Sequence, residues 1–181
     1  MPHVCPWYMA YFFDNPLRRL FMRPERLFAS YVRPGMTALD VGCGMGFNSL
    51  GLARLVRPGG RVFSVDLQPR MLKTLMKRAG RAGLAGLIEP HACEAGHIGV
   101  GAPVDFACLF WVAHETPDEQ ALLRQVGAVL RPGGHLFVAE PKGEVTEIGF
   151  QRLLESAAGA GFTLVDRPRV AFSRAAVLRA G

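Results

Sequence analysis

Three glycines spaced two residues apart, Gly42, Gly44 and Gly46, constrain this chain more than any other feature of its sequence. They stand in "ALDVGCGMGFNSL", between a strand predicted over residues 37–41 and a helix predicted from about Phe47 to residue 56. Glycine has no Cβ, so it adopts positive φ readily and lets the main chain approach a ligand closely. A strand-to-helix turn also leaves backbone N–H groups free. The segment is therefore predicted to be a ligand-binding loop.

The spacing of the glycines distinguishes between ligand classes. A dinucleotide-binding loop, G-x-G-x-x-G, requires its third glycine at position 47, which is Phe47. A phosphate-binding loop requires a following G-K-[ST], which is absent. Asp66 ends the next predicted strand, "RVFSVD", twenty residues beyond Gly46, where a carboxylate can accept hydrogen bonds from both hydroxyls of a ribose. The two features together predict an adenosine-type ligand; the alternative is a tight turn and a surface aspartate.

Beyond residue 37, short apolar runs alternate with longer amphipathic stretches. This alternation is typical of an α/β, Rossmann-like fold, in which a mostly parallel sheet has helices on both faces. Ligands of such sheets bind at the carboxyl ends of the strands. The strands are predicted at 37–41, 61–65, 86–90, 104–109, 134–139, 162–165 and 170–172, and the helices at 47–56, 69–82, 117–130 and after 145.

Composition excludes several classes of protein. The chain has 181 residues, which suits one domain, and half of them are hydrophobic, which is enough for a sizeable core. No apolar run approaches the roughly 20 residues of a membrane span, and the first residues lack the pattern of a signal peptide, so we expect a cytoplasmic protein. The cysteines are scattered without a C-x-x-C pair. We interpret them as buried thiols and expect no metal; they are Cys5, Cys43, Cys93 and Cys108.

The formal charge of +6 comes mainly from two basic regions, residues 18–33 and 70–81. A basic surface can bind nucleic acid, an anionic membrane or an acidic substrate. Charge alone favours a solvated helix face. Residues 1–33 also contain Trp7, Tyr8, Tyr11 and Phe12 at helical spacing, and we predict two short helices there, interrupted at prolines 16 and 24. Such helices could pack on the sheet edge, form an apolar lid over a site, or lie on a membrane surface.

Three segments resemble successive motifs of the class I S-adenosylmethionine-dependent methyltransferases: "LDVGCGMG", "VFSVDLQPRML" and "LRPGGHLFVAEP". The resemblance covers about residues 35–175 and is strongest to the small-molecule branch that includes the quinone-biosynthesis methyltransferases. It implies a single domain with an N-terminal helical lid or cap over residues 1–33 and a cofactor-binding core over 34–181. It also implies a seven-stranded sheet with six parallel strands and one antiparallel strand, for which residues 170–172 are the candidate.

The same resemblance implies S-adenosylmethionine as cofactor and S-adenosylhomocysteine as product. This cofactor carries an amino-acid tail and no pyrophosphate. It therefore suits a loop whose third glycine, Gly46, comes one residue earlier than in a dinucleotide-binding loop. By position, Asp40 would lie near the methionine ammonium, Asp66 would hold the ribose and Leu67 would flank adenine. The other cofactor-binding residues implied by the resemblance are Gly42, Gly44, Gly46, Cys93, Glu94 and Phe110.

The adenine end of this site departs from the family. "HACEAG" occupies the place of a "GDAE"-like motif, and Ala92 stands where an acidic residue often contacts the adenine amino group. Cys93 could offer its backbone N–H to adenine, and Glu94 could replace the missing carboxylate. The alternative is that both are ordinary loop residues.

The segment "LFWVAHETPDE", after the fourth predicted strand, lies where the transferred methyl group would emerge. Phe110 and Trp111 could attract a cationic sulfonium or pack in the core. His114 and Glu115 are the catalytic candidates, because a histidine titrates near neutrality and can take a proton from an acceptor; packing near the next helix is the alternative for His114. Glu140 faces the same rim, or forms a loop salt bridge. The predicted acceptor pocket comprises Trp7, Tyr8, Tyr11, Trp111, His114 and Glu140.

The leading hypothesis is methyl transfer by in-line displacement to an oxygen, carbon or nitrogen of a small molecule. An RNA or protein methyltransferase recruited through the arginine-rich start is one alternative, and a non-catalytic cofactor-binding protein is another. Methyltransferases of adenine amino groups commonly carry N-P-P-Y where this chain reads F-W-V-A, so a nucleic-acid partner is not expected. No long insertion lies between the fifth predicted strand and the last strands, which favours a small acceptor, an open site, or a site completed by a second copy in a homodimer.

Overall fold

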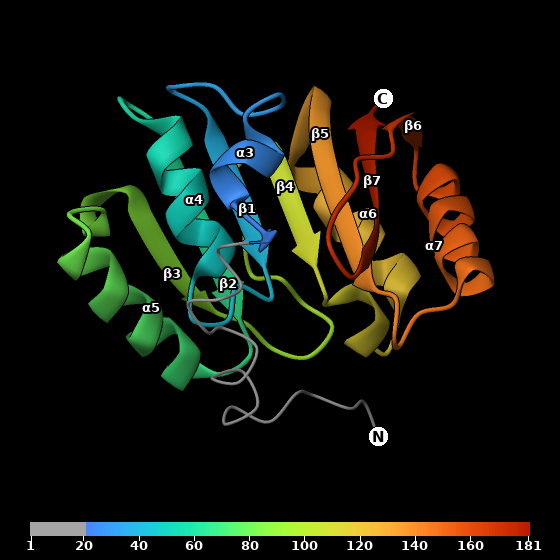
Figure 1. Ribbon diagram of the computed structural model, residues 1–181, viewed down its shortest axis with the longest axis horizontal. Coiled ribbons are helices and arrows are strands. Elements are labelled where there is room, and N and C mark those ends of the chain that lie inside the picture. Colours follow the sequence, from blue (N-terminus) through green and yellow to red (C-terminus); the bar gives the residue numbers. More distant parts are fainter. Residues whose placement is uncertain (1–20) are drawn as a thin grey trace.

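The computed structural model describes residues 21–181, which form a seven-stranded sheet flanked by helices (Figure 1). The strand order is β3-β2-β1-β4-β5-β7-β6. β7 runs antiparallel to both of its neighbours, and all other pairs are parallel, which confirms the predicted topology. The strands are β1 Thr37–Val41, β2 Arg61–Asp66, β3 Ile88–Ala92, β4 Val104–Phe110, β5 Leu130–Pro141, β6 Phe162–Asp166 and β7 Ser173–Ala180.

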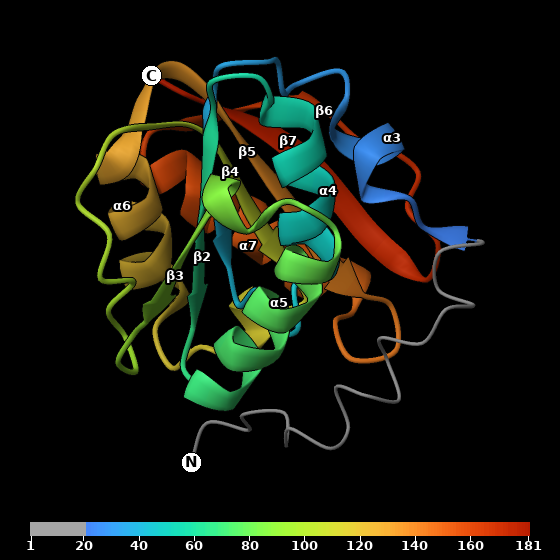
Figure 2. The ribbon, with the colours of Figure 1, turned by 90° about the vertical axis from the view of Figure 1, so that its left-hand side faces the viewer.

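Helices cover both faces of the sheet. Seen from the side, α3, α4 and α5 lie on one face, and α6 and α7 lie on the other (Figure 2). The core is accordingly divided in two: one apolar cluster contains α6 and α7 side chains, and the other contains those of α3, α4 and α5. The helices are α3 Pro24–Phe28, α4 Phe47–Val56, α5 Pro69–Arg81, α6 Glu119–Val129 and α7 Glu147–Gly159, with short 3-10 turns η1 Ala85–Leu87 and η2 Ala113–Glu115.

The reversed strand was predicted at the wrong residues. Residues 170–172 form the turn that leads into β7: Val170 bridges to Ser173, and Phe172 has φ 59°. The apolar residues of this short run indicated a strand. Phe172, however, has a left-handed backbone conformation, which cannot continue a β ladder. β7 instead begins at Ser173, and its small central side chains pair with β5.

Among the boundaries that differ from prediction, two have clear local reasons. Helix α6 begins two residues later than expected, because Asp118 is its N-cap and accepts a hydrogen bond from the Ala121 N–H (2.8 Å). The strand predicted at 134–139 begins earlier, because β5 already starts at Leu130, before the "RPGG" of residues 131–134. The pairing of β5 with β4 shifts register across this segment, so the "RPGG" is an irregularity within the strand.

The described part of the predicted N-terminal cap is a layer of the core. Phe28 is fully buried, and its ring lies 5.4 Å from that of Phe106 and 5.0 Å from that of Phe137. α3 can approach α4 because Gly51 has no side chain; a Cβ there would lie 2.5 Å from the Cβ of Pro24. The predicted pocket residues Trp7, Tyr8 and Tyr11, with Phe12, lie outside the described residues.

Within residues 21–181, no helix has both the length and the apolar character that crossing a bilayer requires.

Candidate cofactor and acceptor site

The three glycines between β1 and α4 all have positive φ, but each is required for a different reason. A Cβ on Gly42 would lie 2.5 Å from Cγ2 of Val112, and one on Gly46 would lie 2.0 Å from Cδ1 of Leu75. Gly42 and Gly46 therefore permit close packing of the loop. Nothing lies within 4 Å of the corresponding position on Gly44, so its bare backbone borders open space.

Asp66 lies beside this open space at the end of β2. One carboxylate oxygen, Oδ2, accepts the Gly44 N–H (2.8 Å), and Oδ1 accepts the Gln68 N–H (2.8 Å). Burial raises the pKa of Asp66, and the two backbone hydrogen bonds partly oppose that shift. A carboxylate has about four lone-pair positions, so each oxygen keeps one for a further donor. Two neighbouring hydroxyls, as on a ribose, would match this pair of acceptors.

The predicted adenine contacts lie next to Asp66 but are not equally available. Leu67 is 40% exposed, so it presents an apolar surface directly beyond the carboxylate. The Cys93 N–H donates to the Asp66 carbonyl (3.1 Å), so this amide is already engaged in the fold. Glu94 is exposed and bridges to His97 through its backbone. The roles of Leu67, Cys93 and Glu94 in adenine binding stay predictions. The hydrogen bond from the Cys93 N–H to Asp66 makes it less available for the adenine contact predicted for this N–H.

Asp40 is held by a buried chain of hydroxyl groups that the sequence analysis missed. It is 1% exposed, and its Oδ2 accepts a hydrogen bond from Ser49 Oγ (2.5 Å) on α4. Ser49 in turn accepts one from Ser64 Oγ (2.9 Å) on β2. The sequence does contain a clue to this hydroxyl chain, namely a serine placed between the apolar residues of "RVFSVD". These two hydrogen bonds fix the position of the Asp40 carboxylate at β1, directly before the glycine loop.

Asn48, in the first turn of α4, was also missed. Its side-chain oxygen is buried and accepts no hydrogen bond from residues 21–181. A buried acceptor of this kind usually has a partner, and an N–H or O–H of a bound molecule could supply one. The bare face of Gly44, the two acceptors on Asp66 and the apolar Leu67 fit the ribose and base of an adenosine. The residues present therefore suit S-adenosylmethionine.

The chain turns sharply where β4 ends. Trp111 has φ 61°, which costs a non-glycine residue on the order of 1–3 kcal/mol. Its backbone N–H donates to the Ala139 carbonyl (2.8 Å), and its Nε1–H donates to Ser173 Oγ (2.9 Å). Phe110 is buried in the core cluster of α3, α4 and α5, and its contact with the cofactor stays a prediction. Strain held in place by the fold often marks a functional segment, and this segment leads directly to His114.

His114 and Glu140, both predicted to line the acceptor pocket, form one unit at the ends of β4 and β5, in which Glu140 is buried and His114 is half-buried. Glu140 is 1% exposed; one of its oxygens accepts the Ala113 N–H (3.0 Å) and the other contacts Nδ1 of His114. On the opposite side of the ring, Nε2 lies 3.3 Å from a carboxylate oxygen of the exposed Glu144. Val112, two residues before His114, is the side chain that packs on Gly42. The unit is therefore beside the glycine loop.

The surroundings of His114 make it a stronger base than free imidazole. Burial by itself would lower its pKa, but the hydrogen bond and charge of Glu140 outweigh burial, with further negative charge from Glu144 and Glu115, so the pKa is raised above 6.5. Because the folded pKa lies above the unfolded one, the resulting stabilisation is complete below pH 6.5 and is lost as pH rises through the raised pKa. Above that pKa, Nε2 can accept a proton.

A methyltransferase domain family matches residues 33–164, which include every described element of this site. The chain belongs to this family. Ubiquinone biosynthesis O-methyltransferase of Caulobacter vibrioides is 32% identical to this methyltransferase domain over 133 residues, covering 69% of the chain and 51% of that protein. Demethylmenaquinone methyltransferase of Geobacillus sp. is 27% identical over 136 residues, covering 75% of the chain and 58% of that protein. The chain spans about half or less of the first curated relatives it matches.

Solved structures share the fold of this methyltransferase domain. A SAM-dependent methyltransferase from Aquifex aeolicus superimposes with a TM-score of 0.86 at 23% identity, covering 98% of this chain and all of that one. The [4+2]-cyclase SpnF superimposes with a TM-score of 0.73 at 19% identity, covering 90% of this chain and 81% of that one. Because a cyclase has the same fold, the activity must be argued from the residues of the site.

Proposed function

We propose that this domain binds S-adenosylmethionine across the glycine loop and Asp66 and transfers its methyl group to a small-molecule acceptor. The observation that carries the proposal is the pairing of Gly44 with Asp66. Bare backbone bordering open space and a carboxylate with two remaining acceptor positions lie together at the ends of β1 and β2. Relatives named as ubiquinone, demethylmenaquinone and arsenite methyltransferases support an acceptor of small-molecule size.

The pair formed by His114 and Glu140 favours an acceptor hydroxyl. A hydroxyl oxygen becomes a strong nucleophile only when it loses its proton, and a histidine within reach can take that proton. Glu140 holds Nδ1 of His114, so Nε2 is the nitrogen left to act as base once the exposed Glu144 side chain moves aside. S-adenosylmethionine supplies an electrophilic methyl group on a cationic sulfur. The protein then has to align the acceptor and exclude water.

The proposal predicts acceptor-dependent formation of S-adenosylhomocysteine. The purified chain is incubated with methyl-labelled S-adenosylmethionine and a panel of catechols, hydroxyquinones and simple phenols, and products are detected by mass spectrometry. We expect labelled methyl ethers from at least one hydroxylated aromatic compound. Cofactor binding without transfer to any acceptor would favour the non-catalytic alternative. Failure to bind either form of the cofactor would refute the proposal as a whole.

The role of His114 is tested by replacing it with glutamine. The His114→Gln variant is expected to lower kcat about 100-fold for a phenolic acceptor, the lower end of the effect of a general base. Its affinity for S-adenosylhomocysteine should not change, because His114 is placed on the acceptor side. The measurement is kcat across pH together with calorimetric titration of the product. An unaltered kcat at every pH would exclude His114 as the base.

Glu140 is a positioning residue in this proposal, and the pH profile reports its effect. Because the pKa of His114 is raised, activity should increase with pH along a limb whose midpoint lies above 6.5. Glu140→Gln removes the charge that contributes most to raising this pKa, so the midpoint should move to lower pH. Glu144→Gln, at an exposed carboxylate on the other side of the ring, is the matched control and should move it less. A Glu140→Gln profile that only decreases in height would indicate a purely structural role.

A further inference from the structure

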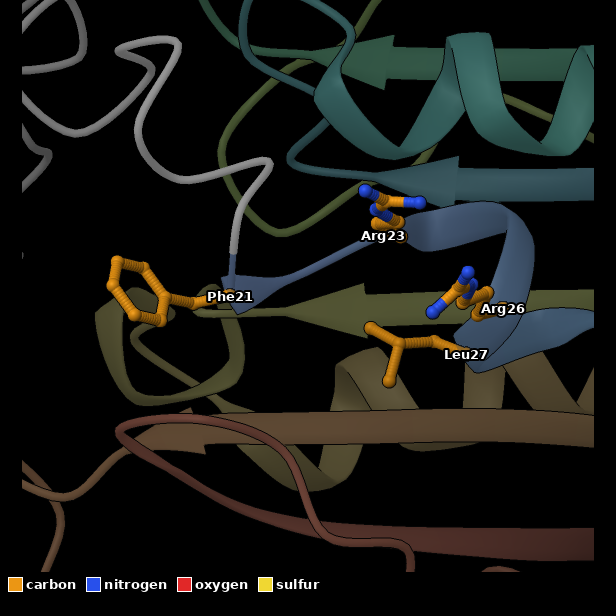
Figure 3. A pocket seen from close by; sticks show the side chains of 4 residues that line it. All are labelled: Phe21, Arg23, Arg26 and Leu27. Atoms are coloured by element: carbon orange, nitrogen blue, oxygen red, sulfur yellow. The ribbon is translucent and has the colours of Figure 1, made fainter.

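A shallow pocket of about 200 Å³ lies outside the cofactor site, against α3. It is lined by Phe21, Arg23, Arg26 and Leu27, and it shares no residue with the glycine loop or with the strand ends. Figure 3 shows Arg26 and Leu27 extending from α3, with Phe21 and Arg23 on the stretch of chain that precedes the helix. The pocket therefore combines two cationic side chains with two apolar ones.

The two guanidinium groups of this pocket have no acidic partner within residues 21–181. Glu25 is the one acidic residue of α3, and its carboxylate pairs with Arg54 of α4 (2.7 Å). Arg23 and Arg26 are exposed, and their side chains form no hydrogen bond or ion pair with the described residues. Guanidinium groups bind carboxylates and phosphates through paired N–H donors. Two guanidinium groups beside one hollow, without an acidic partner in the described part of the chain, thus favour an anionic ligand group.

The apolar side of the pocket continues toward the acceptor site. Phe21 is 67% exposed, and its ring packs in a T-shaped, edge-to-face arrangement with that of Phe172, with centroids 6.4 Å apart. Phe172, also exposed, directly precedes Ser173, whose hydroxyl accepts the hydrogen bond of Trp111 Nε1. Trp111 begins the segment that carries His114. The exposed rings of Phe21 and Phe172 therefore connect the pocket, through Ser173, to the end of β4.

We propose that this pocket is an anion subsite of the acceptor site. It binds a carboxylate or phosphate group of an acceptor whose apolar body lies along Phe21 and Phe172 toward Trp111. The acceptor role rests on the proposed function, whereas the binding of an organic anion does not. The subsite would therefore select acceptors that carry an anionic group at a distance from the methylated atom.

Binding is tested with two fluorescent probes that share an aromatic body. Anilinonaphthalene sulfonate carries an anionic group, and N-phenylnaphthylamine lacks it. We expect Arg26→Gln and Arg23→Gln each to weaken sulfonate binding about ten-fold, and added salt to weaken it in the unaltered protein. Binding of the uncharged probe should not change in either variant. Arg81→Gln, which removes an exposed arginine at the end of α5, is the control with the same loss of charge.

Two results of the probe experiment would overturn the anion subsite. One is sulfonate binding that survives both arginine substitutions. The other is an equal loss for Arg81→Gln, which would show a general effect of net charge. Circular dichroism of each variant checks that the fold is intact, as expected for exposed side chains.

Catalysis tests whether the subsite serves the acceptor. Catechols that carry alkanoic acid chains of increasing length are compared with their methyl esters. We expect one chain length at which the acid has the lower KM, and Arg26→Gln should raise KM about ten-fold for that acid but not for its ester. If neither series is methylated, the proposed function fails, while the probe experiment still decides on anion binding. If both are methylated with KM values that Arg26→Gln leaves unchanged, the subsite inference is wrong.

Discussion

Replacing Asp66 with alanine is expected to weaken the binding of S-adenosylhomocysteine about 500-fold. The two carboxylate oxygens would each accept one ribose hydroxyl, and hydrogen bonds to a charged, buried group contribute about 1.5–3 kcal/mol each. Losing two hydrogen bonds from the lower part of this range costs about 3–4 kcal/mol, or two to three orders of magnitude in the dissociation constant. Isothermal titration calorimetry with S-adenosylhomocysteine measures this directly, without requiring an acceptor.

Asp105 offers a matched control for this substitution. Like Asp66, Asp105 has a carboxylate that accepts a backbone N–H. Its donor is Thr37 (2.8 Å), the first residue of β1, so this carboxylate lies at the end of β1 away from the glycine loop. Asp105→Ala should therefore leave binding of the product unchanged. Asp66→Ala also removes the acceptor of two backbone N–H groups, so thermal unfolding of each variant must accompany the titration. Normal affinity in a folded Asp66→Ala variant would remove Asp66 from the site.

Replacing Gly46 with alanine is expected to lower the free energy of unfolding by about 2–5 kcal/mol. Its φ of 88° is unfavourable for any residue with a Cβ, which contributes about 1–2 kcal/mol. The new Cβ would also lie 2.0 Å from Cδ1 of Leu75, a fully buried side chain. Overpacking of this kind contributes about 1–3 kcal/mol. Urea unfolding followed by circular dichroism gives the difference.

Gly44→Ala separates the binding role of the loop from its role in packing. Its φ of 52° is also positive, so alanine should cost about 1 kcal/mol of stability. No atom lies within 4 Å of the new Cβ, which would project into the space assigned to the cofactor. We therefore expect a small loss of stability and at least about ten-fold weaker product binding. If Gly44→Ala binds the product normally, the cofactor does not approach the loop at this residue.

The local pattern of the sequence was sufficient for most of the fold. Helix α4 has the predicted bounds, and β2 and α5 differ from prediction by one residue at one end, because apolar periodicity, proline and glycine act within a few residues of chain. The alternation of strands and helices predicted the parallel sheet. The prediction failed at residues 170–172, where three apolar residues form a turn whose backbone depends on its contacts with neighbouring segments.

Part of the geometry of the candidate site could also be predicted from the sequence. The sequence by itself determined that a bare glycine loop and an aspartate end two successive strands, and parallel strands bring such ends together. Only the tertiary structure decided that Glu140 is the buried partner of His114, because that contact requires β4 and β5 to be neighbours and to pair Phe110 with Ala139. It also decided which glycines are needed for packing and which one borders open space. Periodicity reports which side chains are buried, whereas the partner of a buried charge depends on strand order and register, which no local pattern contains.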